Sequence, residues 1–182
     1  MIYVFLAHGF EEIEAIATID VLRRCDLQVT TVGITSQYIT GSHHIEVKAD
    51  MLDREFLLDE SLEAIVLPGG MPGTLNLEKS PVVQRAIQYA NENRKLIAAI
   101  CAAPSILGHQ GLLQGRQAVC FPGFEEQLLG AELSDSFVCE DGNIITAKGA
   151  GAAIDFALAI ARKISGDDVK PSKVSESLQR RI

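Results

Sequence analysis

Short apolar runs alternate with amphipathic segments along most of the chain, and this pattern predicts an α/β fold. Four apolar runs rich in branched or small residues predict buried strands, at residues 2–7, 27–34, 64–67 and 96–100. Apolar positions near helical spacing predict helices between and after these strands. Strands that alternate with helices favour a mostly parallel sheet covered by helices on both faces. The helices are expected at residues 11–25, 81–93, 102–107, 125–129 and 152–164, with a last one from Ser172.

Turn and cap residues add local detail to this pattern. Ser80 and Pro81 suit the N-cap and the first position of a helix. The dipeptide Asp141-Gly142 separates two short strand-like runs, residues 137–140 and 143–147, which is typical of a tight β-hairpin. Further short strands are expected at residues 45–49 and 118–119.

Composition narrows the class of protein. The 182 residues are expected to form one domain, residues 1–182. A net charge of −8 disfavours nucleic-acid binding, which needs a basic face. No apolar run reaches the roughly 18 residues of a membrane span, and the acidic residues after the first run disfavour a signal peptide. The four cysteines lack CxxC spacing, which disfavours a disulfide framework or zinc site and favours the reducing cytoplasm. No ligand cluster for a metal or cofactor is visible in the sequence.

Parallel α/β sheets bind ligands outside the carboxyl ends of their strands, and here three strand ends carry unusual residues. Cys101 follows the apolar run 96–100 and precedes a helical pattern, as at a nucleophile elbow. A helix that starts there would favour a thiolate ionised at neutral pH. The alternative is a small buried thiol with no chemical role.

The other two strand ends could complete a site around this sulfur. Glu14 lies near the apolar side of the first helix, where a buried, protonated carboxyl could donate a hydrogen bond to the sulfur or to a substrate oxygen. The N–H groups around Gly69 and Gly70 could bind an oxyanion, although a plain loop explains these glycines equally well. No histidine is placed as the general base of a cysteine protease.

Four sequence blocks together resemble the ThiJ/PfpI superfamily, in the branch named for the Parkinsonism-associated DJ protein. They occur in the family's order over nearly the whole chain, and the set is far more specific than any single block. The blocks are AHGFEEIE at residues 7–14, VLPGG at 66–70, IAAICAAP at 97–104, and TAKGAG with DFA at 146–151 and 155–157.

The resemblance implies a three-layer, flavodoxin-like sandwich, similar to class I glutamine amidotransferases, and a homodimer. It implies that Cys101 is the nucleophile and redox-sensitive thiol and that Glu14 is its protonated partner. The N–H groups of Gly70 and Ala102 would form the oxyanion pocket, beside Gly69.

Some positions depart from relatives. Phe121 stands before a proline where some relatives have a histidine, so a histidine general base is missing. Ala102 replaces the histidine of the protease and amidase branch, which argues against a peptidase. Ala150 replaces the proline of a Gly-Pro-Gly loop. His43 takes the place of an arginine that reaches a neighbouring subunit's site, which suggests an anion-binding role.

Two functions are the main hypotheses. The first is a cofactor-free glyoxalase that converts a small 2-oxoaldehyde such as methylglyoxal to lactate, or a deglycase that uses the same first step on glycated substrates. The second is a redox-sensing, protective or chaperone-like protein whose Cys101 oxidises to a sulfinate held by Glu14. The family's thiazole monophosphate (thiamine) biosynthesis label has no phosphate-binding feature to support it. An interaction domain with a vestigial site is the remaining alternative.

Overall fold

The centre of the structure is a seven-stranded sheet with the order β10-β11-β7-β6-β1-β2-β5. The computed structural model describes residues 1–179. Neighbouring strands of this sheet are parallel, apart from the antiparallel pair β10 and β11. The strands are β1 (Ile2–Leu6), β2 (Val29–Gly33), β5 (Met51–Leu52), β6 (Ala64–Leu67), β7 (Leu96–Ile100), β10 (Val138–Asp141) and β11 (Ile144–Ala147).

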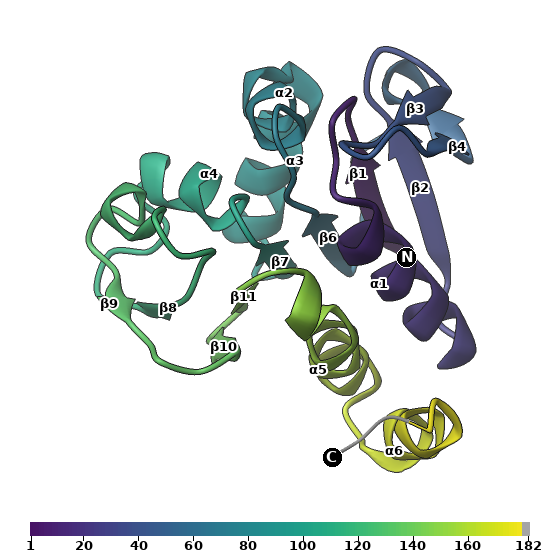
Figure 1. Cartoon of the computed structure of the whole chain (residues 1–182), viewed down its shortest axis with the longest axis vertical. Coiled ribbons are helices and arrows are strands. Elements are labelled where there is room, and N and C mark those ends of the chain that lie inside the picture. Colours follow the sequence, from purple (N-terminus) through teal and green to yellow (C-terminus); the bar gives the residue numbers. More distant parts are fainter. Residues whose placement is uncertain (180–182) are drawn as a thin grey trace.

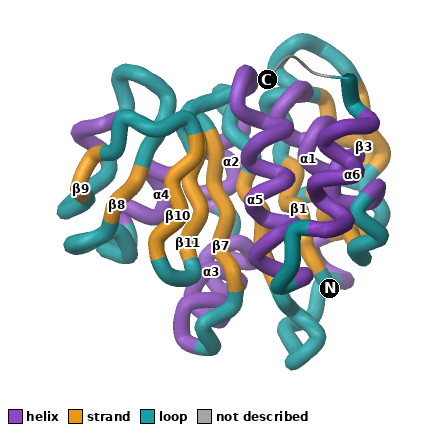
Figure 2. The backbone as a smooth tube through the Cα atoms, turned by 90° about the horizontal axis from the view of Figure 1, so that it is seen from below, coloured by secondary structure: helices purple, strands orange, loops and turns teal. Residues whose placement is uncertain are grey.

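Helices cover both faces of the sheet, which confirms the predicted three-layer α/β fold (Figure 1). Figure 2 shows α1, α5 and α6 on one face and α2, α3 and α4 on the other. Successive residues of β1 point into different cores, because Val4 packs with Phe156 while Phe5 packs with Ile87. The helices are α1 (Glu12–Arg24), α2 (Gly73–Lys79), α3 (Pro81–Glu92), α4 (Pro104–His109), α5 (Ala153–Ser165) and α6 (Val169–Ser177).

Two small strand pairs stand outside the main sheet. The antiparallel pair β3 (Tyr38–Thr40) and β4 (Glu46–Lys48) is tied to the loop after β1, because the Gly9 N–H donates to the Thr40 carbonyl at 2.8 Å. The strands β8 (Gln117–Ala118) and β9 (Glu132–Leu133) form a parallel pair. The β3–β4 hairpin therefore lies next to the start of α1, at the carboxyl edge of the sheet (Figure 1).

Most predicted elements are confirmed, including the N-cap of α3 and the β10–β11 hairpin. The Ser80 hydroxyl accepts the Val83 N–H at 3.5 Å, and Gly142 takes the positive φ of +59° that the tight turn needs. The differences lie at helix boundaries and in short elements that were not predicted, such as α2, β3 and β5. The predicted helix from residue 125 is a single 3₁₀ turn, α4 begins at Pro104 instead of residue 102, and α6 begins at Val169, before Ser172. No helix among the described residues is long and apolar enough to cross a membrane.

Candidate active site

Cys101 directly follows β7, near the middle of the carboxyl edge of the sheet. Its N–H donates to the Ala147 carbonyl at 2.9 Å, and its carbonyl accepts the Phe121 N–H at 2.8 Å. Its φ is +66°, and a turn over residues 101–103 separates it from α4. The side chain packs at the edge of the core formed with α1 and α5. The predicted sharp turn is present, but the six-residue helix α4 starts too late to place its first residue beneath the sulfur.

Glu14 reaches this sulfur from the first turn of α1. Its side chain is buried, with 1% of the residue exposed, and it is hydrogen-bonded to the Cys101 side chain. The Gly69 N–H donates to Glu14 Oε2 at 2.9 Å. The predicted pairing of Cys101 with Glu14 is therefore what the structure shows.

Gly69 makes this pairing sterically possible. A Cβ atom on Gly69 would lie 2.5 Å from Cys101 Cβ and 2.8 Å from Glu14 Oε2, so any side chain would collide with both. The neighbouring Gly70 has a φ of +89°. A Cβ on Gly70 would lie 2.3 Å from the Glu11 backbone nitrogen, so glycine at both positions lets the backbone after β6 approach the pair and the start of α1 closely.

Backbone N–H groups of Gly70 and Ala102 donate hydrogen bonds to the Cys101 sulfur. Both groups were predicted from the sequence as an oxyanion pocket. In the structure they converge on the sulfur, and each favours negative charge there. Negative charge on a sulfur-bound intermediate would develop next to the same donors.

The pKa values of the pair move upward. Burial raises the pKa of Glu14 to about 7, against the hydrogen bonds from Cys101 and Gly69, and the Glu11 charge raises it further. Burial, and then the charge and hydrogen bond of Glu14, raise the pKa of Cys101 to about 12. Burial and the Glu14 charge therefore work against the expected thiolate, and they favour the thiol whenever Glu14 is ionised. The pair loses its first proton near neutral pH, and the loss belongs to both groups together.

Two further residues border the pair, and neither was predicted to belong to it. A Cβ on Gly149 would lie 3.2 Å from Phe121 Cδ2 and 3.8 Å from Glu14 Oε1, so the Phe121 ring stands close to the carboxyl. Phe121 is 48% exposed and forms an apolar wall where some relatives have a histidine. Glu11, which helix-start preference alone could explain, acts on the pair through its charge.

His43 does not join the site as predicted. Its exposed side chain lies against two carboxylates, with Nδ1 3.1 Å from Glu12 Oε2 and 3.4 Å from Glu11 Oε2. These charges raise the pKa of His43, through the Glu12 hydrogen bond first, and they repel anions. The two carboxylates therefore oppose anion binding at His43 within one chain, and the role toward a neighbouring subunit stays a prediction. The expectation of no ligand cluster is wrong, because Glu11, Glu12 and His43 bring their ligand atoms within 4.8 Å of one another.

A buried carboxyl and a cysteine at a strand-to-helix turn, in a three-layer α/β sandwich, define the class of site. The sequence profile of the DJ-1/PfpI family matches residues 1–163, and the chain belongs to this family.

Three relatives illustrate the match. Protein dj-1beta of Drosophila melanogaster is 34% identical over 178 residues, covering 96% of this chain and 94% of that protein. A Caenorhabditis elegans protein named glutathione-independent glyoxalase DJR-1.2 is 31% identical over 160 residues, 87% of this chain and 84% of that one. The structure of a DJ-1 superfamily protein from Salmonella typhimurium has a TM-score of 0.93 at 36% identity, covering 100% of this chain and 98% of that chain.

Proposed function

We propose that this protein is a cofactor-free glyoxalase that converts a small 2-oxoaldehyde such as methylglyoxal to a 2-hydroxy acid. One observation carries the proposal: the Cys101 thiol is hydrogen-bonded to a buried carboxyl whose pKa is about 7. A carboxyl with a pKa near 7 can both accept and return protons at neutral pH. The glyoxalase name of the Caenorhabditis elegans relative supports the same reaction class.

In the first step, ionised Glu14 accepts the Cys101 proton while the sulfur attacks the aldehyde carbon. The C=O π electrons move to the oxygen, which then takes the proton from Glu14, so a neutral hemithioacetal forms and Glu14 is again a carboxylate. Because the sulfur passes its proton to Glu14 during attack, the raised thiol pKa does not prevent the reaction. The N–H groups of Gly70 and Ala102 lie beside the sulfur, where they stabilise the developing oxyanion.

In the second step, the carboxylate form of Glu14 removes the proton from the former aldehyde carbon. An enediolate results, and the hydroxyl proton of the former aldehyde carbon moves to the former ketone oxygen. Glu14 then returns its proton to the neighbouring carbon while a C=O bond forms at the sulfur-bearing carbon, which gives a thioester of the 2-hydroxy acid. Water then cleaves the thioester, which frees the acid and restores the thiol. One carbon is oxidised and its neighbour reduced, so no external oxidant or reductant is needed. Deglycation of glycated thiols or amines would use the same attack.

Lactate formation from methylglyoxal tests the proposal. Cys101→Ser is expected to lower kcat/KM by about 10³-fold or more, because serine at this position lacks a comparable nucleophile. Cys120→Ser is the matched control, since Cys120 is also buried but faces the other core. Equal rates for wild type and Cys101→Ser would refute the proposal. Initial rates on preformed adducts, compared with free aldehyde, separate deglycation from scavenging of released aldehyde.

Oxidation sensing is the second candidate function. The donors around the sulfur, namely protonated Glu14 and two N–H groups, would also hold a sulfinate. The raised pKa of the Cys101 thiol disfavours rapid oxidation, because peroxide reacts with the thiolate form. Mass spectrometry after mild peroxide is nevertheless expected to find oxidation at Cys101 before Cys25, Cys120 or Cys139, because Cys101 is partly exposed and the other three thiols are buried. The reverse order would remove this candidate.

We also propose a homodimer in the cytoplasm, as the resemblance implies. Light scattering coupled to size-exclusion chromatography would measure the assembly state, and a monomer at micromolar concentration would contradict it.

A further inference from the structure

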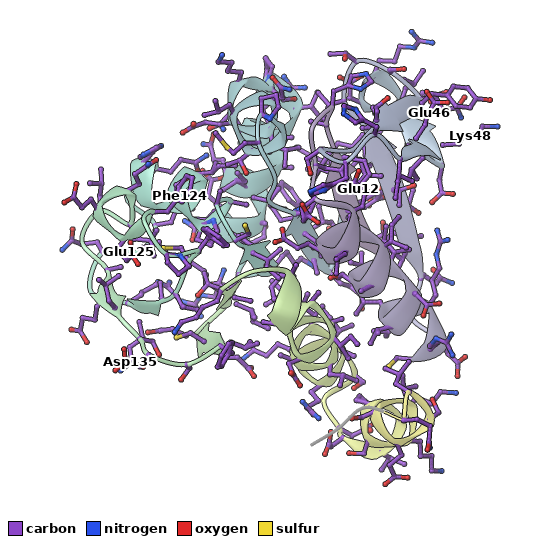
Figure 3. All side chains as sticks on the ribbon, viewed as in Figure 1. Glu12, Glu46, Lys48, Phe124, Glu125 and Asp135 are labelled. Atoms are coloured by element: carbon purple, nitrogen blue, oxygen red, sulfur yellow. The ribbon has the colours of Figure 1, made fainter. Side chains whose placement is uncertain are left out.

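A second cluster of reactive side chains lies beside the catalytic pair, where the first turn of α1 meets the β3–β4 loop. Four ligand-type atoms converge there: two carboxylate oxygens, an imidazole nitrogen and a hydroxyl. Figure 3 shows Glu12 at the start of α1, on the side of the hairpin that carries Glu46 and Lys48. The atoms are Glu11 Oε2, Glu12 Oε2, His43 Nδ1 and Ser42 Oγ.

These four atoms make more close contacts with one another than they have hydrogens to donate. Ser42 Oγ lies 3.1 Å from Glu11 Oε2, 3.2 Å from Glu12 Oε2 and 3.1 Å from His43 Nδ1. His43 Nδ1 adds contacts of 3.1 Å to Glu12 Oε2 and 3.4 Å to Glu11 Oε2. A hydroxyl carries one hydrogen and a ring nitrogen at most one. Two hydrogens can form at most two simple two-centre hydrogen bonds, so the five contacts exceed what such bonds alone would produce.

A cation at the centre of the cluster would accept a lone pair from each of the four atoms and so explain why they lie this close together. Zinc ligands lie about 2.0–2.2 Å from the ion in a tetrahedron, which puts its corners about 3.3–3.6 Å apart. The five contacts of 3.1–3.4 Å come close to these edges. Imidazole nitrogen combined with carboxylate suits Zn²⁺, whereas Mg²⁺ and Ca²⁺ favour sites built from oxygen alone.

The second oxygen of Glu12 holds its carboxylate in position. Glu12 Oε1 accepts the His43 N–H at 2.7 Å and the Ile45 N–H at 3.3 Å, which leaves Oε2 directed at the cluster. Outer hydrogen bonds of this kind orient metal-binding carboxylates in known sites. The Glu12 side chain is only 7% exposed, so its orientation is also fixed by packing.

We propose that Glu11, Glu12, His43 and Ser42 form a Zn²⁺ site at the rim of the active site, separate from Cys101. The donors come from two segments about 30 residues apart, and the imidazole distinguishes the cluster from an acidic helix start. The site does not depend on the proposed glyoxalase reaction.

Zinc affinity, measured by competition with a chromophoric chelator at pH 7.5, tests the site. Wild-type protein is expected to bind one equivalent of Zn²⁺, and His43→Ala and Glu11→Gln are each expected to weaken binding by about 100-fold. His109→Ala is the matched control: His109 also pairs with a glutamate, Glu78, at 2.6 Å, but within residues 1–179 no second carboxylate forms an ion pair with it. This variant should bind zinc like wild type.

Two further measurements locate the metal. Cys101→Ser is expected to keep the affinity, and the Co²⁺-substituted protein should show tetrahedral ligand-field bands without a thiolate charge-transfer band. Loss of binding in Cys101→Ser with retention in His43→Ala would place the metal on the sulfur and overturn the proposal. Equal affinity of wild type and His43→Ala would also overturn it. Circular dichroism of the metal-free variants checks folding, and His43 is exposed enough for its removal to leave the fold intact.

Discussion

Two glutamates in the same turn of α1 meet opposite surroundings. Burial opposes the charge of both. At Glu12, hydrogen bonds from its own N–H and from His43 and Ile45 outweigh burial and lower the pKa to about 2. At Glu14, one N–H and a thiol do not outweigh burial, and the pKa rises to about 7.

The comparison shows that helix position does not decide the role of an acid; the depth of its burial and the donors that it meets decide together. Glu12 is a permanent anion that organises the β3–β4 loop. Glu14 is left short of donors and so can exchange a proton with Cys101. The glycines after β6 create this difference, because they bring one N–H and the sulfur to Glu14 while excluding other groups.

The largest expected effect comes from neutralising Glu14. Glu14→Gln keeps the shape but cannot accept the Cys101 proton, so methylglyoxal turnover should fall by about 10²–10⁴-fold. The pKa of Cys101 should fall from about 12, because the Glu14 charge helps to raise it. Slower turnover together with a lower Cys101 pKa, measured by pH-dependent alkylation, would mark Glu14 as a base. Unchanged turnover would refute that role, and Glu46→Gln, on the exposed β4 strand, is the control.

Crowding the pair is expected to have the next largest effect. Gly69→Ala pushes a methyl group against Cys101 and Glu14, and a displacement of about 1 Å can cost about 100-fold in rate. Gly151→Ala is the matched control, since a Cβ there meets no atom within 4 Å. Steady-state kinetics and thermal unfolding of both variants measure the effect. Similar kinetics for the two variants would contradict the steric role of Gly69.

The two glutamates should also give opposite pH dependences of stability. The folded pKa of Glu12 is about 2, below its ordinary value of 4.5, so its contribution is present above pH 4.5 and lost as the pH falls through 2. The folded pKa of Glu14 is about 7, so its contribution is complete below pH 4.5 and lost as the pH rises through 7.

Urea unfolding with a chelator present, between pH 2 and 8, measures these slopes. Glu12→Gln should flatten the acid side of the stability profile, and Glu14→Gln the side between pH 4.5 and 7. If both variants flatten the same side of the stability profile, the pKa values assigned to the two carboxyls are wrong.

The smallest expected effect comes from Ser42→Ala. The hydroxyl is one of several donors to Glu12, so its loss should cost about 0.5–1.5 kcal/mol in free energy of unfolding. The pKa of Glu12 should stay low because the backbone donors remain. A pKa near 4.5, measured by NMR titration, would show that the side chain and not the loop backbone holds the anion.

The long elements could be predicted because their residues carry a clear period or an unbroken apolar run. The short elements could not: β5 has two residues and α2 begins at a glycine, so neither shows a pattern. In the site, Cys101, Glu14 and the glycines were found through their sequence blocks. The direction of the Cys101 pKa was missed because it depends on burial and on an ionised neighbour. The acidic surroundings of His43 were missed because its glutamate partners are about 30 residues away in the chain.

The left-handed backbone at Cys101 sets a conflict between reactivity and folding. A residue with a Cβ loses roughly 1–2 kcal/mol in this region, and glycine does not. Cys101→Gly should therefore unfold at higher denaturant concentration than Cys101→Ala, although both are inactive. A side chain at this turn therefore lowers the stability of the fold.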